Sequence, residues 1–399
     1  MNTKTIRLVA LIAVSTIATD LGLSQTSGAR NQALGGTGVA SSNPQTAAFV
    51  NPAMIRHGAG DQGLSVVVPF VGAFAADQGD FADKVDDLQG SIDVVKAFLN
   101  AGDLVSADAL RPTIASQLQA LNGSSVDVLA SGGVGVVVPF EGLTVAVSAR
   151  SYVDARAITF VDPDDLNTIA TSVDPDDFDD LQSPAFAAAA GVAEFGVSLA
   201  TELEVLGRDL TIGVTPKAQA VETYNYAVSV STFDGDDALN DFGDDQYRDS
   251  ESGFNVDVGA AMDVTSGLTA ALSVQNLMSD TYRTVITAGR QFSYKVEPRP
   301  VLGLAYSSGG LTLTGDVELL ATTRFEEIPD SQFVRAGVEY DLVGWAQLRA
   351  GLALDLEETQ SDILSAGLGL SPFETLRVDL VGQLSENGGG AGVQLALTF

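Results

Sequence analysis

A two-residue alternation of apolar and polar side chains recurs from about residue 63 to the C-terminus and constrains the fold more than any other feature. The stretch AQLRAGLALD, residues 346–355, has alanine or leucine at every second position. Neighbouring side chains of a β-strand point to opposite faces, so this pattern predicts strands with one apolar face. Each stretch is about ten residues long, which is the length that a tilted strand needs to cross a bilayer.

The composition favours a membrane barrel over a soluble sheet. Hydrophobic residues make up 45% of the chain and charged residues 18%, whereas soluble domains average about 25% charged residues. Beyond the first residues, no stretch approaches the ~18 unbroken apolar residues of a spanning helix. High hydrophobicity without such a helix is typical of a transmembrane β-barrel. A soluble β-sandwich, whose strands also alternate, is the alternative.

We predict an all-β fold, a transmembrane antiparallel β-barrel of about 14 strands within residues 61–399. Bacterial barrels have an even number of strands, and the count of alternating stretches is about fifteen. We therefore expect one of two weak stretches, 132–140 or 222–232, to be a loop or part of a neighbouring strand. Short turns such as 266–267 alternate with long polar insertions such as 155–184, as in outer-membrane barrels.

Residues 1–18 have the features of a cleavable signal peptide. Lys4 and Arg7 give a positive start, and an apolar run follows from residue 8 to residue 18. Thr16 and Ala18 are small residues at suitable positions for cleavage near residue 19. The alternative is an N-terminal anchor helix, for which the run is too short. We therefore expect the protein to leave the cytoplasm.

The last strand ends in phenylalanine and has apolar residues at alternate positions, which are Val393, Leu395, Leu397 and Phe399. This ending resembles the signal that the outer-membrane barrel insertion machinery reads. Such a strand presents an unpaired edge and can then close the barrel on the first strand. We therefore name the insertion machinery as an expected partner.

The segment from residue 19 to residue 60 lies between the leader and the first strand and lacks a long apolar run. Gly35, Gly36 and Gly38 allow positive φ and close backbone approach. Asn51, Pro52 and Ala53 end the segment, and the proline restricts both its own φ and the residue before it. Such a compact and irregular segment could be a plain loop or a plug inside a barrel.

The charge and the rare residues exclude several functions. The formal net charge is −32, so the chain is a poor candidate for nucleic-acid binding, which needs clustered lysine and arginine. There is no cysteine and a single histidine, His57, which excludes disulfides, thiolate sites and histidine clusters. We expect His57 to be a turn residue rather than a catalytic base, and we expect no cofactor and no enzyme activity.

Residues 80–121 break the strand pattern, because their apolar residues recur at helical spacing. We expect two short amphipathic helices between the first two strands. They could serve as a lid or a docking site for an apolar ligand or partner, or they could merely cover the barrel mouth.

An acidic sequence, VDPDD, occurs at 161–165 and again at 173–177. Its weak calcium candidates are Asp162, Asp164, Asp174 and Asp176, because carboxylate oxygens suit Ca²⁺. The spacing differs from that of an EF-hand, and solvated loops are the favoured interpretation. We therefore predict no metal site, with Ca²⁺ bridging to lipopolysaccharide as a weak alternative.

Charged residues on the polar face of the strands are expected to line the lumen, where they pair with each other and with the plug. These residues are Asp257, Asp316, Glu318, Arg335, Glu339, Arg349, Arg377 and Asp379.

The stretch GARNQALGGTGVASS, the later AAFVNPA and the ending GGGAGVQLALTF resemble the FadL superfamily of outer-membrane barrels. The resemblance is closer still to the TraF-type barrels, which are named as conjugal transfer proteins. It covers nearly the whole chain and implies a fourteen-stranded barrel with an N-terminal luminal hatch. By this resemblance, Gly35 to Ala53 form the hatch and gate the lumen.

The resemblance implies a protein of the outer membrane of a Gram-negative bacterium, in contact with lipid and lipopolysaccharide. The function expected is passive uptake of hydrophobic small molecules. The alternative is a structural or assembly barrel of a conjugation or secretion apparatus without transport. The TraF-type name is a weak guide, because the F-plasmid protein of that name is thioredoxin-like and unrelated, and no residue here indicates conjugation.

Overall fold

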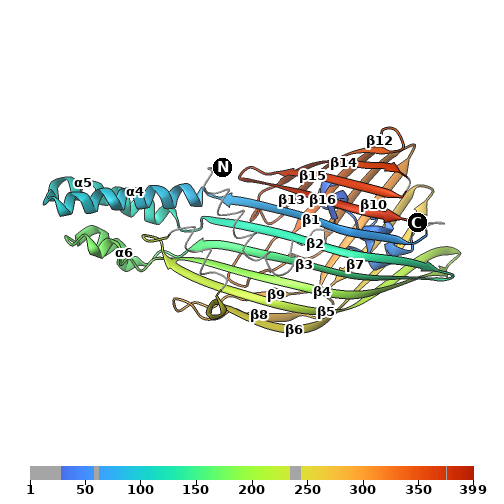
Figure 1. Cartoon of the computed structure of the whole chain (residues 1–399), viewed down its shortest axis with the longest axis horizontal. Helices are drawn as coiled ribbons and strands as arrows, with labels where there is room; N and C mark the ends of the chain where they lie inside the picture. The colour runs from blue at the N-terminus through green and yellow to red at the C-terminus, as the bar shows by residue number, and fades with distance from the viewer. Residues whose placement is uncertain (1–27, 58–62, 234–243, 374) are drawn as a thin grey trace.

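The structure, a computed structural model, describes residues 28–57, 63–233, 244–373 and 375–399. The described residues form a closed antiparallel barrel in which β1 and β16 close the ring (Figure 1). The predicted signal peptide, 1–18, lies outside the described residues, as do the two ends of the predicted hatch segment.

The fourteen strands of the ring confirm the predicted architecture. In chain order they are β1 (Ser65–Gln78), β2 (Ser125–Phe140), β3 (Leu143–Thr159), β4 (Pro184–Val205), β5 (Arg208–Ser229), β6 (Arg248–Thr265), β7 (Leu268–Gln275), β10 (Arg299–Ser308), β11 (Leu311–Glu318), β12 (Phe333–Asp341), β13 (Ala346–Asp355), β14 (Ile363–Phe373), β15 (Leu376–Leu384) and β16 (Gly388–Thr398). The weak stretch 222–232 continues β5, so it is part of a neighbouring strand as expected, while 132–140 belongs to β2.

One predicted strand, 292–306, is divided in two. Residues 293–296 form β9 (Ser293–Val296), which pairs with β8 (Asp280–Arg283) in a separate two-stranded sheet. Residues 299–308 form β10 of the barrel. Pro298 lies at the break and has no N–H to donate to a strand ladder, which explains why the strand is interrupted there.

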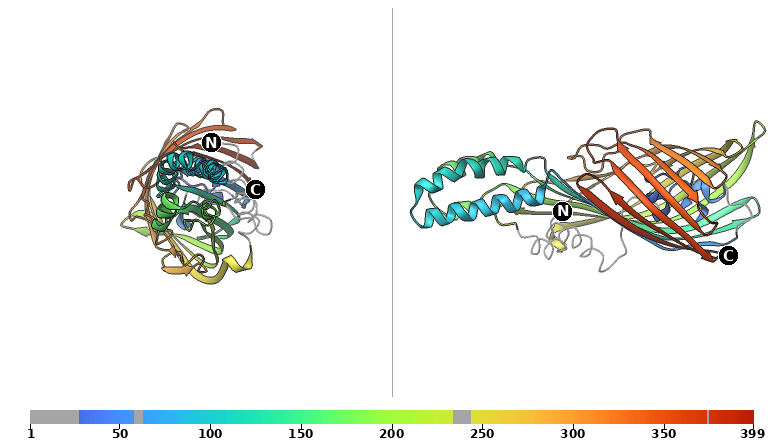
Figure 2. Two further views of the ribbon diagram at one scale, coloured as in Figure 1. Left: turned by 90° about the vertical axis from the view of Figure 1, so that its left-hand side faces the viewer. Right: turned by 90° about the horizontal axis from the view of Figure 1, so that it is seen from above.

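The predicted helical insertion is present within its expected bounds, but its two helices are longer than expected. It consists of α4 (Phe81–Asn100) and α5 (Leu104–Ala120), which project beyond the strands along the barrel axis (Figure 2). The shorter α6 (Pro163–Thr171) and η2 (Asp176–Phe178) lie at the same end, where η3 (Asp245–Tyr247) also precedes β6. In the described part of the chain, no helix is both long and apolar enough to cross a membrane.

The base of the hairpin of α4 and α5 contacts the ends of β1 and β2. Its buried residues share one hydrophobic cluster with residues of β2 to β5 such as Val126, Ala155 and Ala189. Val126 is next to Asp127, which lines the interior, so Val126 lies on the outer face. The cluster therefore joins the hairpin to the outer face at the ends of these strands, while most of the hairpin projects beyond them.

Away from the hairpin, the outer face of the barrel is apolar and exposed. Along β13, Leu348 is 48% exposed whereas its neighbour Arg349 is 4% exposed. Leu304, Leu364 and Leu380 are exposed in the same way on other strands. The alternation read from the sequence thus separates an outer apolar face from an inner polar one.

Candidate functional site

The described part of the N-terminal segment lies inside the barrel, in the half that holds the short turns (Figure 1). It contains three short helices, α2 (Gly28–Ala33), α3 (Pro44–Ala47) and η1 (Pro52–Ile55), and every residue of these helices is buried. Asparagines begin the last two helices: the Asn43 side chain accepts from Thr46 N–H, and the Asn51 side chain accepts from Ala53 N–H. Both asparagines have an extended backbone, and each side-chain oxygen accepts from a backbone N–H of the first helical turn, as is typical of helix N-caps. We call residues 28–57 the hatch.

The hatch glycines are needed for its turns. Gly35 and Gly36 have φ of +74° and +83°, a region that other residues rarely adopt. A Cβ on Gly38 would lie 2.2 Å from Asn31 Nδ2. Asn51 is fully buried and donates from Nδ2 to Val39 O at 2.9 Å. These residues therefore determine the fold of the hatch itself.

Glycines on the inner face of the barrel receive the hatch. They are Gly213, Gly259, Gly303, Gly337, Gly351 and Gly367. A Cβ on Gly351 would lie 1.9 Å from Gly35 N, and one on Gly213 would lie 2.3 Å from Pro52 C. Real Cβ atoms do not approach other atoms this closely, so the barrel backbone touches the hatch where no side chain fits. We call these six residues the glycine seat.

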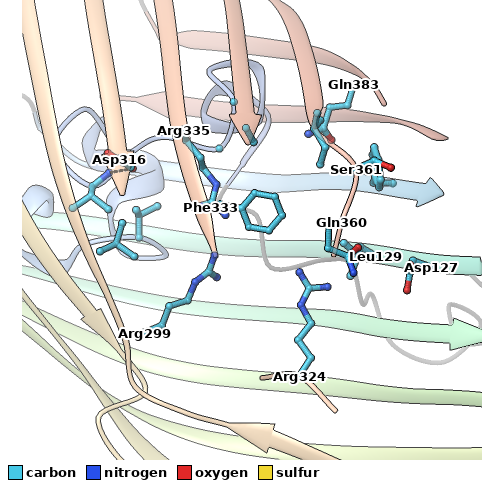
Figure 3. Close-up of a pocket in the computed structure, with 18 of the residues that line it drawn as sticks. Asp127, Leu129, Arg299, Asp316, Arg324, Phe333, Arg335, Gln360, Ser361 and Gln383 are labelled. Atoms are coloured by element: carbon cyan, nitrogen blue, oxygen red, sulfur yellow. Dashed lines mark hydrogen bonds between the residues drawn. The ribbon is translucent and has the colours of Figure 1, made fainter. Parts of the chain in front are cut away.

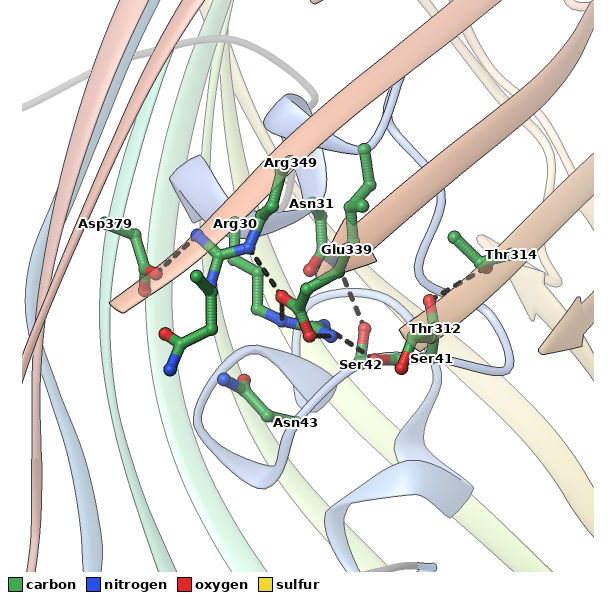
Figure 4. Close-up of polar contacts among 12 residues, drawn as sticks. Arg30, Asn31, Ser41, Ser42, Asn43, Thr312, Thr314, Glu339, Arg349 and Asp379 are labelled. Carbon is green, nitrogen blue, oxygen red and sulfur yellow. Dashed lines mark hydrogen bonds and ion pairs between the residues drawn. The ribbon is translucent and has the colours of Figure 1, made fainter. Parts of the chain in front are cut away.

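An ion-pair chain ties the start of the hatch to the barrel wall (Figure 4). Arg30 of α2 donates to both carboxylate oxygens of Glu339, at 2.9 and 3.0 Å. Glu339 also accepts from Arg349, whose guanidinium is 2.7 Å from Asp379, and Arg377 is 3.2 Å from the same carboxylate. Burial alone would lower the pKa of the Arg30 guanidinium, but the Glu339 carboxylate raises it above its ordinary value. Arg30 therefore stays charged inside the barrel.

A second group of predicted lumen charges lies around Asp316. Its Oδ2 accepts from the backbone N–H groups of Gly38 and Val39, at 2.8 and 3.0 Å. Glu318, two residues along the same strand, is 2.7 Å from Arg335 and also pairs with Arg299. The Asp316 carboxylate therefore binds the hatch backbone, and the Glu318 carboxylate binds two guanidinium groups of the barrel wall.

Asp257 belongs to a third group, on the opposite wall. It is 2.9 Å from Lys217 Nζ, which is also 3.1 Å from Glu194. Glu194 pairs with Arg150, and Arg150 donates to Phe49 O of the hatch at 3.0 Å. The eight predicted lumen residues thus fall into three networks, each of which contacts the hatch or groups bound to it.

Polar contacts also hold the end of the hatch. His57 lies in a turn, with Nδ1 3.2 Å from Thr211 Oγ1 and Nε2 3.2 Å from Asp263 Oδ1. The adjacent Arg56 is 3.3 Å from Glu202. The histidine therefore anchors the hatch at the barrel rim.

A cavity of about 150 Å³ lies beside the hatch (Figure 3). Gly35, Gly36, Val39, Phe49 and Val50 of the hatch line one end of it. Its walls include apolar side chains, which are Phe74, Leu129, Val301, Phe333 and Ile363, and three guanidinium groups, those of Arg299, Arg324 and Arg335. The cavity combines an apolar surface with fixed polar groups, as small-molecule sites do.

The weak calcium candidates act as local caps. Asp162 begins α6 and accepts from Asp164 N–H at 2.9 Å, and Asp174 accepts from Asp176 N–H at 3.1 Å. Among the described residues, no group of three or more histidine, cysteine, aspartate or glutamate side chains could hold a metal ion.

The C-terminal strand pairs with both β1 and β15. Val393 lies opposite Val71 in the β1–β16 register, and Phe399 N–H donates to Leu64 O at 2.9 Å. Val393, Leu395 and Phe399 are exposed, and Leu397 is half-buried. The structure thus places the predicted insertion signal on the strand that closes the ring.

Sequence reasoning found the eight lumen charges of the barrel but missed other residues of the site. Arg30, Arg150 and Lys217 were not singled out, and neither was the glycine seat. The glycines carried a usable signal, because glycine inside a strand marks a close approach of another backbone. The contacts of Arg30 with Glu339 and of Arg150 with Phe49 carried none, because these partners are 309 and 101 positions apart in the chain.

The structure resembles solved transport proteins. The toluene transporter TbuX of Ralstonia pickettii matches with a TM-score of 0.59 and 12% identity, over 94% of this chain and 99% of that chain. A FadL homologue of Pseudomonas aeruginosa matches with a TM-score of 0.55 and 12% identity, over 95% and 99%. The toluene transporter TodX of Pseudomonas putida matches with a TM-score of 0.52 and 11% identity, over 94% and 99%. At these identities the likeness shows the fold alone.

No curated protein matches the chain. A family model described as "F plasmid transfer operon, TraF, protein" matches residues 48–318, which is more than half of the chain. The chain therefore belongs to this TraF family, and its fold is that of the FadL-type barrels.

Proposed function

We propose that the protein is an outer-membrane channel for passive uptake of hydrophobic small molecules, with the hatch as its gate. The observation that carries this proposal is the hatch itself, which rests on the glycine seat at one end of a largely apolar cavity. The solved barrels with the same fold include toluene transporters. The three ion-pair networks hold the hatch in the lumen, which supports its role as a gate.

The outer face supports a place in the outer membrane of a Gram-negative bacterium, in contact with lipid and lipopolysaccharide. Exposed aromatic residues lie near the short turns and the C-terminus, and they are Phe140, Tyr306, Tyr340, Trp345, Phe373 and Phe399. Such aromatic residues form girdles where a barrel meets the membrane surface. In this orientation the short turns and the hatch are periplasmic, and α4 and α5 are extracellular.

The test is uptake into liposomes that contain the refolded protein. A radiolabelled monoaromatic hydrocarbon and a labelled long-chain fatty acid are offered separately, and empty liposomes serve as the baseline. Uptake should rise above that baseline and should fall when Leu129 in the cavity is replaced by tryptophan. The matched control is Leu348→Trp on the lipid-facing side, which should not change uptake. Equal uptake with and without protein would rule out the proposal.

A structural or assembly role is the second candidate. The hairpin of α4 and α5 projects beyond the strands, which favours contact with another protein (Figure 2). An affinity capture from outer membranes, with a chain lacking residues 82–121 as the control, tests it. A stoichiometric partner that is lost with the hairpin would favour this role, and capture of none would exclude it.

A further inference from the structure

Two loop segments fold into the lumen at the end opposite the hatch. They are residues 276–298, which include β8 and β9, and residues 319–332, and we call them together the lid. Tyr282, Phe292, Tyr294 and Phe325 of the lid are each at most 2% exposed. They share one hydrophobic cluster with barrel residues of β3, β4 and β5. The lid is therefore packed as tightly as a protein core.

The barrel residues of this cluster face the lumen. Tyr152 of β3 is two positions from Arg150, which reaches the hatch, and Val192 of β4 is two positions from Glu194. Residues two apart on a strand share a face. The lid thus lies inside the ring.

Hydrogen bonds attach the lid to β5. Asn225 Nδ2 donates to Val285 O and to Arg290 O, each at 2.9 Å, and Thr287 Oγ1 donates to Asn225 O at 2.7 Å. Thr223 Oγ1 donates to Arg283 O at 3.1 Å. These bonds satisfy backbone carbonyls that a mobile loop would leave to water.

The lid is also attached to β3 and β6. Arg324 is 3.2 Å from Asp154 of β3, and Asn255 of β6 donates to Met278 O at 2.8 Å. Within the lid, Lys295 N–H donates to Arg324 O at 2.8 Å, which joins the two segments. The lid is therefore one unit that packs against the inner face of β3 to β6.

The cavity lies in the other part of the lumen. Its described lining residues come from the hatch, from β1, β2, β7 and β10 to β15, and from the loop before β14, and none of them comes from β3 to β6. The lid contributes Arg324 to the cavity wall. At the end away from the hatch the cavity reaches Gln78, whose Nε2 donates to Asp127 at 2.9 Å and to Gln360 at 3.1 Å.

We propose that the lid confines the path through the barrel to the side of the lumen bounded by β1, β2, β7 and β10 to β15, with its mouth at Gln78, Asp127 and Gln360. This inference rests on the proposed function, because the protein needs a path through the barrel only if a solute passes. The path runs from this mouth past Leu129 and Phe333 to the hatch. The opposite side, along β3 to β6, is closed by the packed lid.

Single-cysteine labelling tests the path without any ligand, because the natural chain has no cysteine. Leu129→Cys places a thiol in the cavity, Ala190→Cys places one on β4 under the lid, and Val105→Cys places one on exposed α5 as the positive control. Each refolded variant is treated with a charged, water-soluble thiol reagent. Exposed thiols react and buried ones are inert, so Leu129→Cys should react roughly tenfold or more faster than Ala190→Cys.

A lid-weakened chain, with Phe292→Ala and Phe325→Ala, should raise the labelling of Ala190→Cys and leave that of Leu129→Cys unchanged. Folding of each variant is checked by the shift in gel mobility between boiled and unboiled samples. Equal labelling rates of Leu129→Cys and Ala190→Cys in proteins whose lid is unaltered would overturn the inference. Fast labelling of Leu129→Cys in a protein that takes up no solute would instead support the path and contradict the proposed function.

Discussion

The proposed gating role of the hatch can be tested directly by adding one methyl group at the glycine seat. The Cβ of Gly351→Ala would lie 1.9 Å from Gly35 N and 2.2 Å from Leu34 C. Both atoms are backbone, so neither can rotate away, and the hatch must shift. Overpacking of this kind costs typically about 1–3 kcal/mol. If that cost falls on the docked hatch alone, the ratio of undocked to docked hatch rises by about 5- to 150-fold.

The assay is the ion conductance of single barrels in planar bilayers, where an undocked hatch should appear as more frequent or longer openings. Limited proteolysis of the hatch gives a second readout, because a segment that leaves the lumen becomes accessible to protease. Gly213→Ala extends the test to the other end of the hatch, since its Cβ would lie 2.3 Å from Pro52 C.

Gly382→Ala is the matched control. This glycine lies in β15, has no positive φ, and has no atom within 4 Å of its Cβ position. Its replacement should leave conductance unchanged and stabilise the chain slightly, by up to about 1 kcal/mol, through the unfolded state. If Gly351→Ala gave the same conductance and the same protease resistance as Gly382→Ala, the reasoning about the seat would be refuted.

Three further predictions concern the hatch, the lipid face and the buried charges. Deletion of residues 31–53 should raise ion conductance in planar bilayers, and unchanged conductance would show that the hatch does not limit flow. Leu352→Lys, on the exposed face in the middle of β13, should lower stability by about 2–4 kcal/mol, measured by denaturant unfolding in lipid, whereas Val105→Lys on α5 should cost little. Asp379→Ala leaves the fully buried Arg349 without one partner and should cost about 3–5 kcal/mol; Glu202→Ala at the rim is its exposed control, and equal losses would contradict the burial argument.

The architecture could be predicted because it depends on local periodicity. The alternation in residues such as 346–355 already separated an outward Leu348 from an inward Arg349. The two helices of residues 80–121 were predicted from their spacing, although their projection beyond the strand ends was not. The break at Pro298 was missed, because alternation continues on both sides of it and only the pairing of β9 with β8 reveals the separate sheet.

The site was predicted in part. Inward charges such as Glu339 and Asp379 follow from the side of the strand that they occupy. Their partners do not, because Arg30 and Glu339 are 309 positions apart in the chain. The lid was invisible for a similar reason: its aromatic residues lie in segments that connect barrel strands, and the sequence of such a segment does not indicate which wall it will pack against.

The sequence alone determined that this chain forms a membrane barrel, because strand length and two-residue alternation are properties of each segment and need no distant contact. Only the tertiary structure decided how the lumen is filled. Closing the ring brings six strand glycines against one N-terminal segment and two loops against one wall, and these contacts depend on the shape of the closed barrel. The sequence pattern indicates which face of a strand a residue occupies, but not which distant segment packs against that face.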